Sequence, residues 1–442
     1  MRVLYTLLAT LALPFASLVV LWRGLRERAY WRGWRARFGG GAELPGEARG
    51  LWVHAVSVGE VQAAMSLVTA LRKAWPSLPL AVTSATPAGR ERAREACAAD
   101  AAVDVRYAPY DLPWAVRGAL RRLRPGLLVI VETELWPNLL HECAREGMPV
   151  LVASARVSAR SAARWARFRG LLQPALGTTV TVAAQSAADA GRFTSLGVPA
   201  ARIHVCGNIK FDRTPGAAVR ERALQLRARY AAARPMWVAG STHPGEESAA
   251  LEAHAALRTT HGDALLVLAP RHRPRFGEVA TTLEASGLSW LRRSATARDP
   301  ADAGGAAAAA TASNAAVLLL DTIGELEDFY AAADVAFVGG SLVPIGGHNL
   351  LEPAALGVAT LTGPYQHNAP DIARLLGDAG GLQFVGNGAE LGAALLRLMS
   401  DEAARARLTT AAQAAVAVNR GALAKILGLV SDLLASPPRP RP

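Results

Sequence analysis

Short hydrophobic runs alternate with longer amphipathic stretches along two parts of the chain. In the first part, from Leu51 onward, the runs read LWVHAV, LPLAVTS, LLVIVE, MPVLVAS, VTVAAQ and IHVCG. In the second part they read MWVAGS, LLVLAP, AVLLLD, DVAFVGG and VATLTG. Apolar runs of strand length separated by helix-length segments are typical of parallel, doubly wound sheets. The pattern therefore predicts an α/β protein with two Rossmann-like domains.

Length and local composition predict where these domains begin and end. A chain of 442 residues exceeds what one hydrophobic core usually supports, which favours two domains. We expect a first Rossmann-like domain, a charged connection and a second Rossmann-like domain over residues 41–215, 216–234 and 235–436. The alanine-rich run Asp299–Ala316 is predicted to be a surface excursion, and residues 437–442 form a proline-rich tail.

The N-terminal 40 residues differ from the rest in hydropathy and charge. Tyr5–Trp22 carries no charge and is long enough to cross or embed in a membrane. A basic cluster mixed with aromatic residues follows it, comprising Arg23, Arg26, Arg28, Arg32, Arg35 and Arg37. A secretory signal would carry this charge before the apolar run, so the order predicts an uncleaved membrane anchor. The positive-inside rule then places the remaining chain in the cytoplasm.

The mode of attachment is left open by the sequence. A spanning helix is slightly favoured over monotopic insertion, in which aromatic rings and arginines hold a helix on the membrane surface. Pro14 lies in the middle of the apolar run and would kink or break a spanning helix. A soluble amphipathic helix packed on the body of the protein is the remaining alternative.

The composition limits which kinds of charged, cysteine and metal sites the chain can contain. The net charge is +12, and nearly all of the basic residues are arginine, since the chain has only three lysines, at Lys73, Lys210 and Lys425. Because nearly all basic residues of this chain are arginine, a lysine indicates a position where a compact ammonium is needed. Cys97, Cys143 and Cys206 are too widely spaced for a zinc site, and we expect reduced thiols without disulfides. No DxD-type pair follows a strand, so we expect neither a metal nor a cofactor.

Three polar motifs follow strands of the first predicted domain. Glu60 ends HAVSVGE at the start of a helix, where it is either a helix cap or a general base. Glu132 and Glu134 follow the strand LLVIV, and packing does not explain two carboxylates there. Lys210, in GNIKFD, is suited to neutralise charge on a departing phosphate, although an interdomain ion pair is the simpler alternative.

The second predicted domain carries three further loops. Arg271 follows a strand and suits a phosphate or a base edge, and Gly324 allows close approach of backbone to a ligand. The glycine-rich segments 339–341 and 346–353 are predicted to present backbone N–H groups to a phosphate, with Glu352 on ribose hydroxyls. Ligands bind at the carboxyl ends of strands in such sheets, so we expect the loops of both domains to meet in one cleft.

Taken together, these motifs resemble the bacterial Kdo (3-deoxy-D-manno-oct-2-ulosonic acid) transferases, lipid A-specific enzymes of glycosyltransferase family 30. The resemblance covers essentially the whole chain and rests on HAVSVGE, YDLPWA, VETELWPNLL, ASARVSARSA, GNIKFD, STHPGEE, APRHRPRF, DTIGEL and FVGGSLVPIGGHNLLEPAALG. It implies a GT-B fold and an inverting transfer of Kdo from CMP-Kdo to a lipid A precursor (lipid IVA) in lipopolysaccharide core biosynthesis. The implied location is the cytoplasmic face of the inner membrane, without a nucleic-acid partner.

The resemblance also implies roles for particular residues. Glu60 matches the proton acceptor, and Glu132 and Lys210 match positions that stabilise the transition state. The residues that match the CMP-binding loops are Pro270, Arg271, Ile323, Gly324, Glu325, Asn349, Leu350, Leu351 and Glu352. The alternatives are another GT-B sugar-nucleotide enzyme that uses a UDP-sugar, and a non-catalytic nucleotide-binding scaffold at the membrane. The number of Kdo units, the acyl pattern of the acceptor and the oligomeric state do not follow from the sequence.

Overall fold

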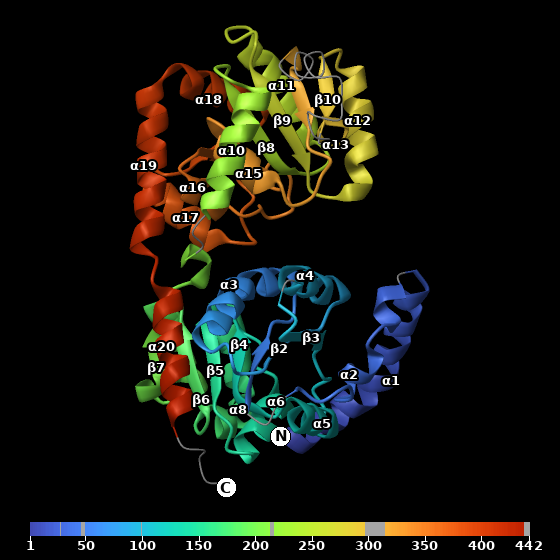
Figure 1. Cartoon of the computed structure of the whole chain (residues 1–442). Helices are drawn as coiled ribbons and strands as arrows, with labels where there is room; N and C mark the ends of the chain where they lie inside the picture. The colour runs from blue at the N-terminus through green and yellow to red at the C-terminus, as the bar shows by residue number, and fades with distance from the viewer. Residues whose placement is uncertain (27, 46–48, 99, 213–215, 297–313, 437–442) are drawn as a thin grey trace. The chain divides into compact units, whose positions relative to one another are not determined.

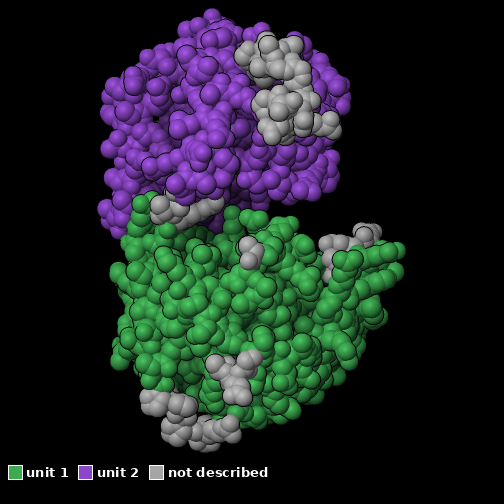
Figure 2. All heavy atoms as spheres, viewed as in Figure 1, with its two compact units in different colours: residues 1–212, 419–442 green, residues 213–418 purple. Residues whose placement is uncertain are grey.

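The computed structural model describes residues 1–26, 28–45, 49–98, 100–212, 216–296 and 314–436. The chain forms two compact units, and Figure 2 shows which residues belong to each. Unit 1 comprises Met1–Asp212 and Asn419–Pro442, and unit 2 comprises Arg213–Val418. The predicted proline-rich tail and almost all of the predicted alanine-rich excursion lie outside the described residues.

Unit 1 is built on a seven-stranded parallel sheet in the order β3-β2-β1-β4-β5-β6-β7 (Figure 1). Its strands are β1 (Gly50–His54), β2 (Leu80–Ser84), β3 (Val103–Tyr107), β4 (Pro125–Val131), β5 (Val150–Ala155), β6 (Val180–Ala184) and β7 (Ile203–Val205). The chain moves outward from β1 to β3 and then returns to place β4 beside β1. This reversal is a topological switch point, the place where α/β sheets bind ligands.

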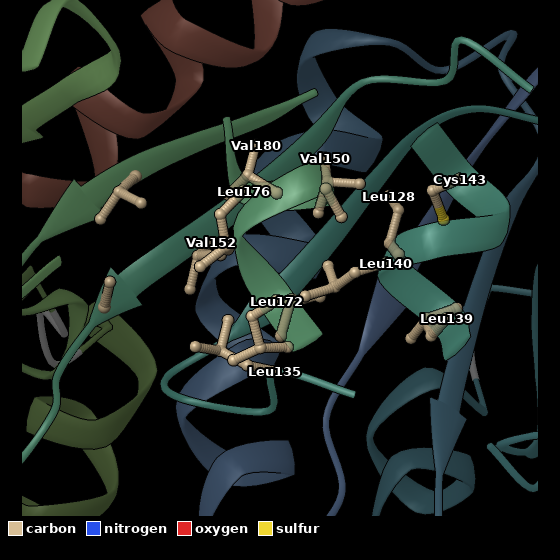
Figure 3. Close-up of a cluster of buried hydrophobic side chains, with 14 of the residues drawn as sticks. Leu128, Leu135, Leu139, Leu140, Cys143, Val150, Val152, Leu172, Leu176 and Val180 are labelled. Atoms are coloured by element: carbon tan, nitrogen blue, oxygen red, sulfur yellow. The ribbon is translucent and has the colours of Figure 1, made fainter. Parts of the chain in front are cut away.

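Helices cover both faces of this sheet, as the doubly wound pattern predicts. They are α3 (Val58–Ala74), α4 (Pro87–Cys97), α5 (Pro113–Leu123), α6 (Pro137–Arg145), α7 (Ala159–Arg167), α8 (Arg169–Leu176) and α9 (Ala187–Leu196), with short 3₁₀ turns η2 (Ala200–Arg202) and η3 (Ile209–Asp212). Alternate residues of the strands point to separate hydrophobic clusters. In one cluster, strand residues Leu128, Val150, Val152 and Val180 pack with side chains from α6 and α8 (Figure 3).

Unit 2 repeats the plan with a second parallel sheet, in the order β10-β11-β9-β8-β12-β13-β14. Its strands are β8 (Met236–Thr242), β9 (Leu265–Pro270), β10 (Trp290–Arg292), β11 (Val317–Leu319), β12 (Val335–Val338), β13 (Ala359–Thr362) and β14 (Gln383–Phe384). The switch point of this sheet lies between β8 and β12.

The helices of unit 2 pack around this sheet and its hydrophobic core. They are α10 (Ala217–Tyr230), α11 (Glu246–Arg258), α12 (Phe276–Ala285), α13 (Arg293–Thr296), α15 (Leu326–Ala332), α16 (Leu351–Leu356), α17 (Pro370–Asp378), α18 (Gly388–Ser400) and α19 (Glu402–Val418), with one 3₁₀ turn, η4 (Arg273–Arg275). The predicted connection over residues 216–234 is therefore largely α10, an integral helix of unit 2. Arg222 binds Asp328 of α15 through two hydrogen bonds of 2.7 and 2.9 Å.

The C-terminal helix α20 (Ala422–Ala435) belongs to unit 1, so the second domain does not extend to residue 436 as predicted. Its apolar residues Ile426 and Val430 are buried in the core of unit 1. Asp212 accepts the backbone N–H groups of Gly421 and Leu423, both at 2.5 Å. Apolar burial and this cap return the end of the chain to the first unit, a relationship between distant segments that local sequence patterns do not report.

The N-terminal helix α1 (Arg2–Arg26) continues through Pro14 without a break. Residues of α1 meet the length and hydropathy of a membrane span over Arg2–Leu25, and none of the best window is buried. The run Glu402–Ala435 meets the same test, but it contains residues of both cores. Large apolar side chains of α1 are exposed, among them Leu7, Leu11, Phe15 and Leu18.

Both ends of α1 are joined to unit 1. Near its start, Tyr5 donates to Asp111 at 2.8 Å and Thr6 donates to Asn138 at 2.9 Å. Beyond its end, η1 (Arg28–Trp31) and α2 (Trp34–Arg37) lead into the body of the unit. Arg37, predicted to be part of a lipid-facing basic cluster, is instead buried, with its guanidinium 3.8 Å from the centroid of the Tyr107 ring.

Candidate functional site

The polar motifs of unit 1 gather at the switch point of its sheet. Glu60 lies in the helix after β1, and Glu132 lies directly after β4, the strand that pairs with β1. Lys210 is in η3, which follows the edge strand β7 and contacts α3. The structure therefore brings together Glu60, Glu132 and Lys210, as the strand-end pattern predicted.

Glu60 forms a complete capping box with Ser57 at the start of α3. Its Oε2 accepts the backbone N–H groups of Val56 at 2.6 Å and Ser57 at 3.1 Å. In return, the N–H of Glu60 donates to the Ser57 hydroxyl at 3.3 Å. The capping role that the sequence left open is thus present. The other carboxylate oxygen of Glu60, Oε1, takes part in none of these capping bonds.

Burial raises the pKa of the Glu60 carboxyl above its ordinary value. The N–H groups of Ser57 and Val56 oppose this rise, whereas the negative charges of Glu134 and Glu132 add to it. A carboxylate with a raised pKa is a stronger base than an ordinary glutamate. Glu60 therefore combines a fixed side chain with a raised basicity and an oxygen, Oε1, that has no hydrogen-bond partner among the described residues.

Glu132 and Lys210 form a direct ion pair. The Lys210 Nζ donates to Glu132 Oε1 at 2.7 Å, and the two side chains are 36% and 23% exposed. Glu132 has a φ of 64°, in the left-handed region that costs a non-glycine residue about 1 kcal/mol or more. Such strain at the end of a strand is typical of residues whose side chains must point in a required direction.

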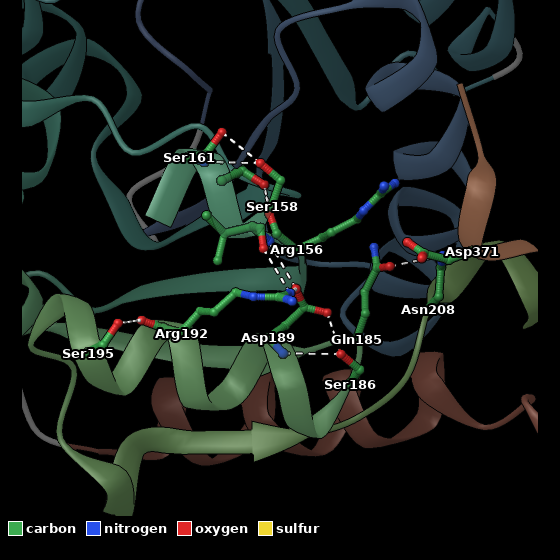
Figure 4. A network of polar contacts seen from close by, with 12 residues as sticks. Arg156, Ser158, Ser161, Gln185, Ser186, Asp189, Arg192, Ser195, Asn208 and Asp371 are labelled. Atoms are coloured by element: carbon green, nitrogen blue, oxygen red, sulfur yellow. Dashed lines mark hydrogen bonds and ion pairs between the residues drawn. The ribbon is translucent and has the colours of Figure 1, made fainter. Parts of the chain in front are cut away.

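Amide groups fix the loop that carries Lys210, and Figure 4 shows the side chains of two of them, Gln185 and Asn208. The backbone N–H of Lys210 donates to Asn208 Oδ1 at 2.9 Å, and Asn208 Nδ2 donates to Gln185 Oε1 at 3.2 Å. Gln185 in turn donates to the carbonyl of Ser154 at 2.9 Å. The loops after β6 and β7 are thereby joined to each other and to the end of strand β5.

A second network in Figure 4 orders the loop after β5. Asp189 accepts from the backbone N–H of Val157 at 3.1 Å, from Arg192 at 3.1 Å and from the Ser186 hydroxyl at 2.5 Å. Arg192 also donates to the Val157 carbonyl at 3.0 Å. The Thr133 hydroxyl, next to Glu132, donates to the carbonyl of Arg156 in this loop. The motif ASARVSARSA is thus a support for the glutamate-bearing loop.

Asp111 is a site-supporting residue that the sequence reasoning did not single out. Its Oδ1 accepts the Leu139 N–H at 2.7 Å, and its Oδ2 accepts the Asn138 N–H at 3.1 Å, so it caps α6 from a distant loop. The same Oδ2 accepts from Tyr5 of α1. Burial raises the pKa of Asp111. The N-terminal helix is therefore bonded to the motif that contains Glu134 and Trp136.

The predicted nucleotide-binding residues lie at the carboxyl edge of the sheet in unit 2. Pro270 ends β9, and the exposed Arg271 follows it, with its backbone N–H on the Thr242 carbonyl at 3.0 Å. Ile323 is 55% exposed, and Gly324 has a φ of 94°. The strand order β11-β9-β8-β12 makes these loops neighbours of the loop after β12.

The other predicted residues of unit 2 are partly engaged by the protein itself. Glu325 is held by Arg293 at 2.6 Å, and although burial acts to raise its pKa, the hydrogen bonds from Arg293 and Thr322 lower it. Asn349 donates to Glu352 at 3.2 Å and accepts from the Leu351 N–H at 3.2 Å. The side chains of Leu350 and Leu351 are buried, which leaves their main chain for ligand contact.

The glycine-rich turn after β12 is not a free phosphate cradle, which corrects the prediction for residues 339–341. The fully buried carboxylate of Glu246 fills it. Oε2 accepts the Gly340 N–H at 2.7 Å, and Oε1 accepts the N–H groups of Ser341 at 2.8 Å and Leu342 at 2.9 Å. A fourth bond, of 2.9 Å, comes from the His243 N–H. Glu246 thus ties the loop after β8 to the loop after β12.

The two sets of predicted residues lie in different units, so the common cleft stays a prediction. Among the described residues, no group of three or more His, Cys, Asp or Glu side chains is arranged to hold a metal ion. Unit 1 contains a basic carboxylate beside an ammonium. Unit 2 contains a set of loops at the switch point of its sheet.

Two Rossmann-like units of this kind define the GT-B class of sugar-nucleotide enzymes. The structure of the UDP-GlcNAc 2-epimerase of Neisseria meningitidis aligns with a TM-score of 0.56 over 86% of this chain and 100% of that chain. Since the two sequences are only 12% identical, this likeness concerns the fold alone.

Sequence comparison identifies the family within that class. Residues 32–213 match the family model of 3-deoxy-D-manno-octulosonic-acid transferase (kdotransferase). The 3-deoxy-D-manno-octulosonic acid transferase of Haemophilus influenzae is 36% identical over 436 residues, 98% of this chain and 99% of that protein. The Bordetella pertussis transferase is 37% identical over 440 residues, 96% and 98% of the two chains. The chain belongs to the Kdo transferase family and is a glycosyltransferase.

Proposed function

We propose that the chain transfers Kdo from CMP-Kdo to lipid IVA, a lipid A precursor, in lipopolysaccharide core biosynthesis. Membership of the Kdo transferase family supports Kdo as the sugar that is transferred. The observation that carries the mechanism is the raised pKa of Glu60 beside the Lys210–Glu132 ion pair at the switch point of unit 1. The donor and acceptor follow from the motif resemblance.

In this proposal Glu60 is the general base. Its free Oε1 takes the proton from a glucosamine 6′-hydroxyl of the acceptor, while the capping bonds hold Oε2 in place. The hydroxyl oxygen forms a bond to the anomeric C2 of Kdo as the bond from C2 to the phosphate oxygen breaks. CMP leaves with that electron pair, and the configuration at C2 inverts. One base suffices because the phosphate of CMP is a good leaving group.

Lys210 and Glu132 act together as stabilisers of the transition state. Lys210 is 36% exposed, so its ammonium can meet a substrate oxygen while it stays bonded to Glu132. Negative charge develops on the departing phosphate, and a fixed ammonium stabilises that charge more in the transition state than in the bound donor. Glu132 orients the ammonium, and the strained backbone at Glu132 is consistent with this constraint.

In this proposal unit 2 binds the donor. Pro270 and Arg271, Ile323 to Glu325, and Asn349 to Glu352 would bind CMP-Kdo. The exposed Ile323 side chain suits the face of a pyrimidine, and Gly324 lets backbone approach a ligand closely. Asn349 and Glu352 already bond to one another, which orients both side chains for ribose hydroxyls.

Attachment to the cytoplasmic face of the inner membrane is part of the proposal. The exposed apolar side chains of α1 match a lipid surface better than water. Because both ends of α1 join unit 1, insertion into one leaflet fits the contacts of Tyr5 and Thr6 better than a crossing of the membrane. This reverses the slight preference for a spanning helix drawn from the sequence.

The direct test is transfer of Kdo from freshly generated CMP-Kdo to lipid IVA, followed by product mass, with wild type and Glu60→Gln compared. Product from the wild type alone supports the reaction and the base, and its mass counts the sugars added. If folded wild-type protein makes no product, UDP-sugars are the next donors to test. Equal product from both proteins would remove Glu60 from the role of base.

A further inference from the structure

The loops at the switch point of unit 2 contain three histidines that no step above uses. His243 follows β8, His272 follows β9, and His348 lies in the long loop after β12. The ring centroids of His243 and His272 are 5.4 Å apart, and those of His243 and His348 are 5.1 Å apart. The positive charge of Arg271 also acts on His348. Three imidazoles and one guanidinium therefore form a compact group at the edge of the sheet where ligands bind.

The central pair in this group has a definite hydrogen-bond chemistry. Nε2 of His243 and Nε2 of His348 are 2.8 Å apart, so one ring donates and the other accepts. In a neutral imidazole, the ring that accepts at Nε2 must carry its proton on Nδ1. That Nδ1–H is a donor that requires no net charge. The pair thus presents an N–H to a ligand even when both rings are neutral.

The remaining members of the group are available for a ligand. Arg271 and His272 are exposed, and within the described part of the chain neither side chain has a hydrogen-bond or ion-pair partner. The carboxylates nearest to His243 are already engaged. Glu246 accepts four backbone N–H groups, and Glu247 is paired with Arg275 at 2.6 Å. The guanidinium of Arg271 has only donors, each neutral imidazole can turn one N–H outward, and the nearby carboxylates are occupied, so the group favours an anion.

We infer that His243, His272 and His348 form, together with Arg271, the site that binds the phosphate of the donor nucleotide. The inference rests on the proposed function for the identity of that nucleotide. Glu246 is a positioning residue, because its bonds place both His243 and the loop that carries His348. The backbone turn at Gly340–Leu342 would ordinarily offer N–H groups to a phosphate, but it binds Glu246 instead, so side chains take over this task.

Proton uptake should accompany binding. Burial lowers the pKa of His348 to about 3, with Arg271, His243 and His272 adding to the effect. Burial also lowers the pKa of His243, which faces Glu246, Glu247, His272 and Arg275. An anion beside these rings favours their protonated forms and raises both pKa values. Affinity for the phosphate dianion should therefore increase as the pH falls toward the raised pKa values of these rings.

The test compares CMP with cytidine by calorimetry on the full-length protein in detergent. Because CMP and cytidine share the base and the ribose, the difference between their affinities measures the contribution of the phosphate. We expect His243→Asn and His348→Asn to weaken CMP about tenfold or more and cytidine by less than about twofold. His261→Asn, beyond the far end of α11 from this group, is the matched control and should leave both affinities unchanged. Wild-type titrations in buffers of different ionisation enthalpy measure the proton uptake.

The outcomes separate this inference from the proposed function. Equal weakening of CMP and cytidine in the histidine variants would mean a purely structural role and would overturn the phosphate site. UMP and uridine are titrated in parallel: a phosphate effect seen with UMP but not CMP keeps the site and refutes the CMP donor. Wild-type protein that binds neither monophosphate more tightly than its nucleoside refutes the site outright.

Discussion

Lys210 Nζ lies 2.7 Å from Glu132 Oε1, and the two residues come from loops 78 positions apart in the chain. The pair is neither buried nor fully exposed, so its members remain open to a substrate while they orient one another. An exposed ion pair of this kind contributes little to folding, on the order of 1 kcal/mol or less. Its value is therefore expected in catalysis rather than in stability.

The first prediction concerns this pair as a unit. Lys210→Gln and Glu132→Gln should each lower kcat by about 100-fold to 1,000-fold, because each removes the oriented ammonium from the transition state. The double variant should be no worse than the poorer single variant by more than about threefold, since both changes remove one interaction. Steady-state kinetics of the four proteins measure this coupling.

Lys73→Gln is the matched control, because Lys73 is an exposed lysine on α3 of the same unit. It should retain wild-type kcat. Multiplicative losses in the double variant would show that Lys210 and Glu132 act independently, against the paired geometry.

A second prediction separates the two roles of Glu60. Glu60→Gln keeps a side-chain oxygen for the N–H groups of Val56 and Ser57 but cannot take a proton, so kcat should fall by at least about 100-fold with little change in Tm. Ser57→Ala removes the other half of the capping box and should cost about 1 kcal/mol of stability while kcat is retained. Kinetics and thermal melts on both variants measure the two effects. If Glu60→Gln lowered Tm but kept wild-type kcat, Glu60 would be a helix cap and not the base.

The raised pKa of Glu60 predicts a pH dependence. The base acts in its deprotonated form, so the rate falls as the pH drops through its pKa, and the acid limb should lie above the range of an ordinary glutamate. Glu134→Gln removes a negative charge that raises this pKa, so the acid limb should move to lower pH. Profiles of kcat/KM against pH test the shift, with the exposed Glu43→Gln as the control. An unmoved limb in Glu134→Gln would contradict the electrostatic coupling.

A fourth prediction concerns the return of α20 to unit 1. Asp212 holds Gly421 and Leu423 at the start of this helix, so Asp212→Ala should cost about 1 to 2 kcal/mol. Hydrogen exchange should accelerate in α20 first. Asn387→Ala, which removes the cap of α18 in unit 2, should be comparably destabilising without that local change. Uniform exchange in Asp212→Ala would mean that apolar burial alone holds α20.

Much of the fold could be read from the sequence because buried parallel strands are continuous apolar runs. The runs LLVIV and LLVLA correspond to β4 and β9, near the centres of their sheets. The strands that were missed lie at or near sheet edges. β3 reads VDVRY, with polar residues that a half-covered edge strand tolerates, whereas β10 and β14 contain only three and two residues. Such short or polar strands owe their structure to neighbours rather than to their own composition.

The catalytic candidates could be predicted because each lies in the loop or the first helical turn that follows a strand. The supporting residues could not, since Asp111 and Glu246 act on backbone N–H groups distant in sequence. Glu246 also shows why the glycine pattern misled: glycines permit a turn with exposed N–H groups, but they do not decide which anion fills it. A carboxylate of the protein, 95 residues away, occupies the place expected for a phosphate.

The last prediction concerns the N-terminal helix. Deletion of residues 1–22 would remove the exposed apolar surface of α1 and, with it, the bonds from Tyr5 to Asp111 and from Thr6 to Asn138. Two variants separate these effects. Exchange of the exposed Leu7, Leu11, Phe15 and Leu18 for serine should reduce the membrane-bound fraction and preserve kcat on detergent-dispersed acceptor.

Tyr5→Phe should do the opposite, since it keeps the apolar surface of α1 and leaves the half-buried Asp111 short of one donor. We expect a loss of about 1 to 3 kcal/mol in stability and a lower kcat in detergent, with wild-type flotation on vesicles. Thr10→Ala is the control, because the Thr10 hydroxyl bonds only within α1, to the Thr6 carbonyl. If Tyr5→Phe matches wild type in stability and turnover, α1 serves attachment alone and its bond to Asp111 does not reach the active site.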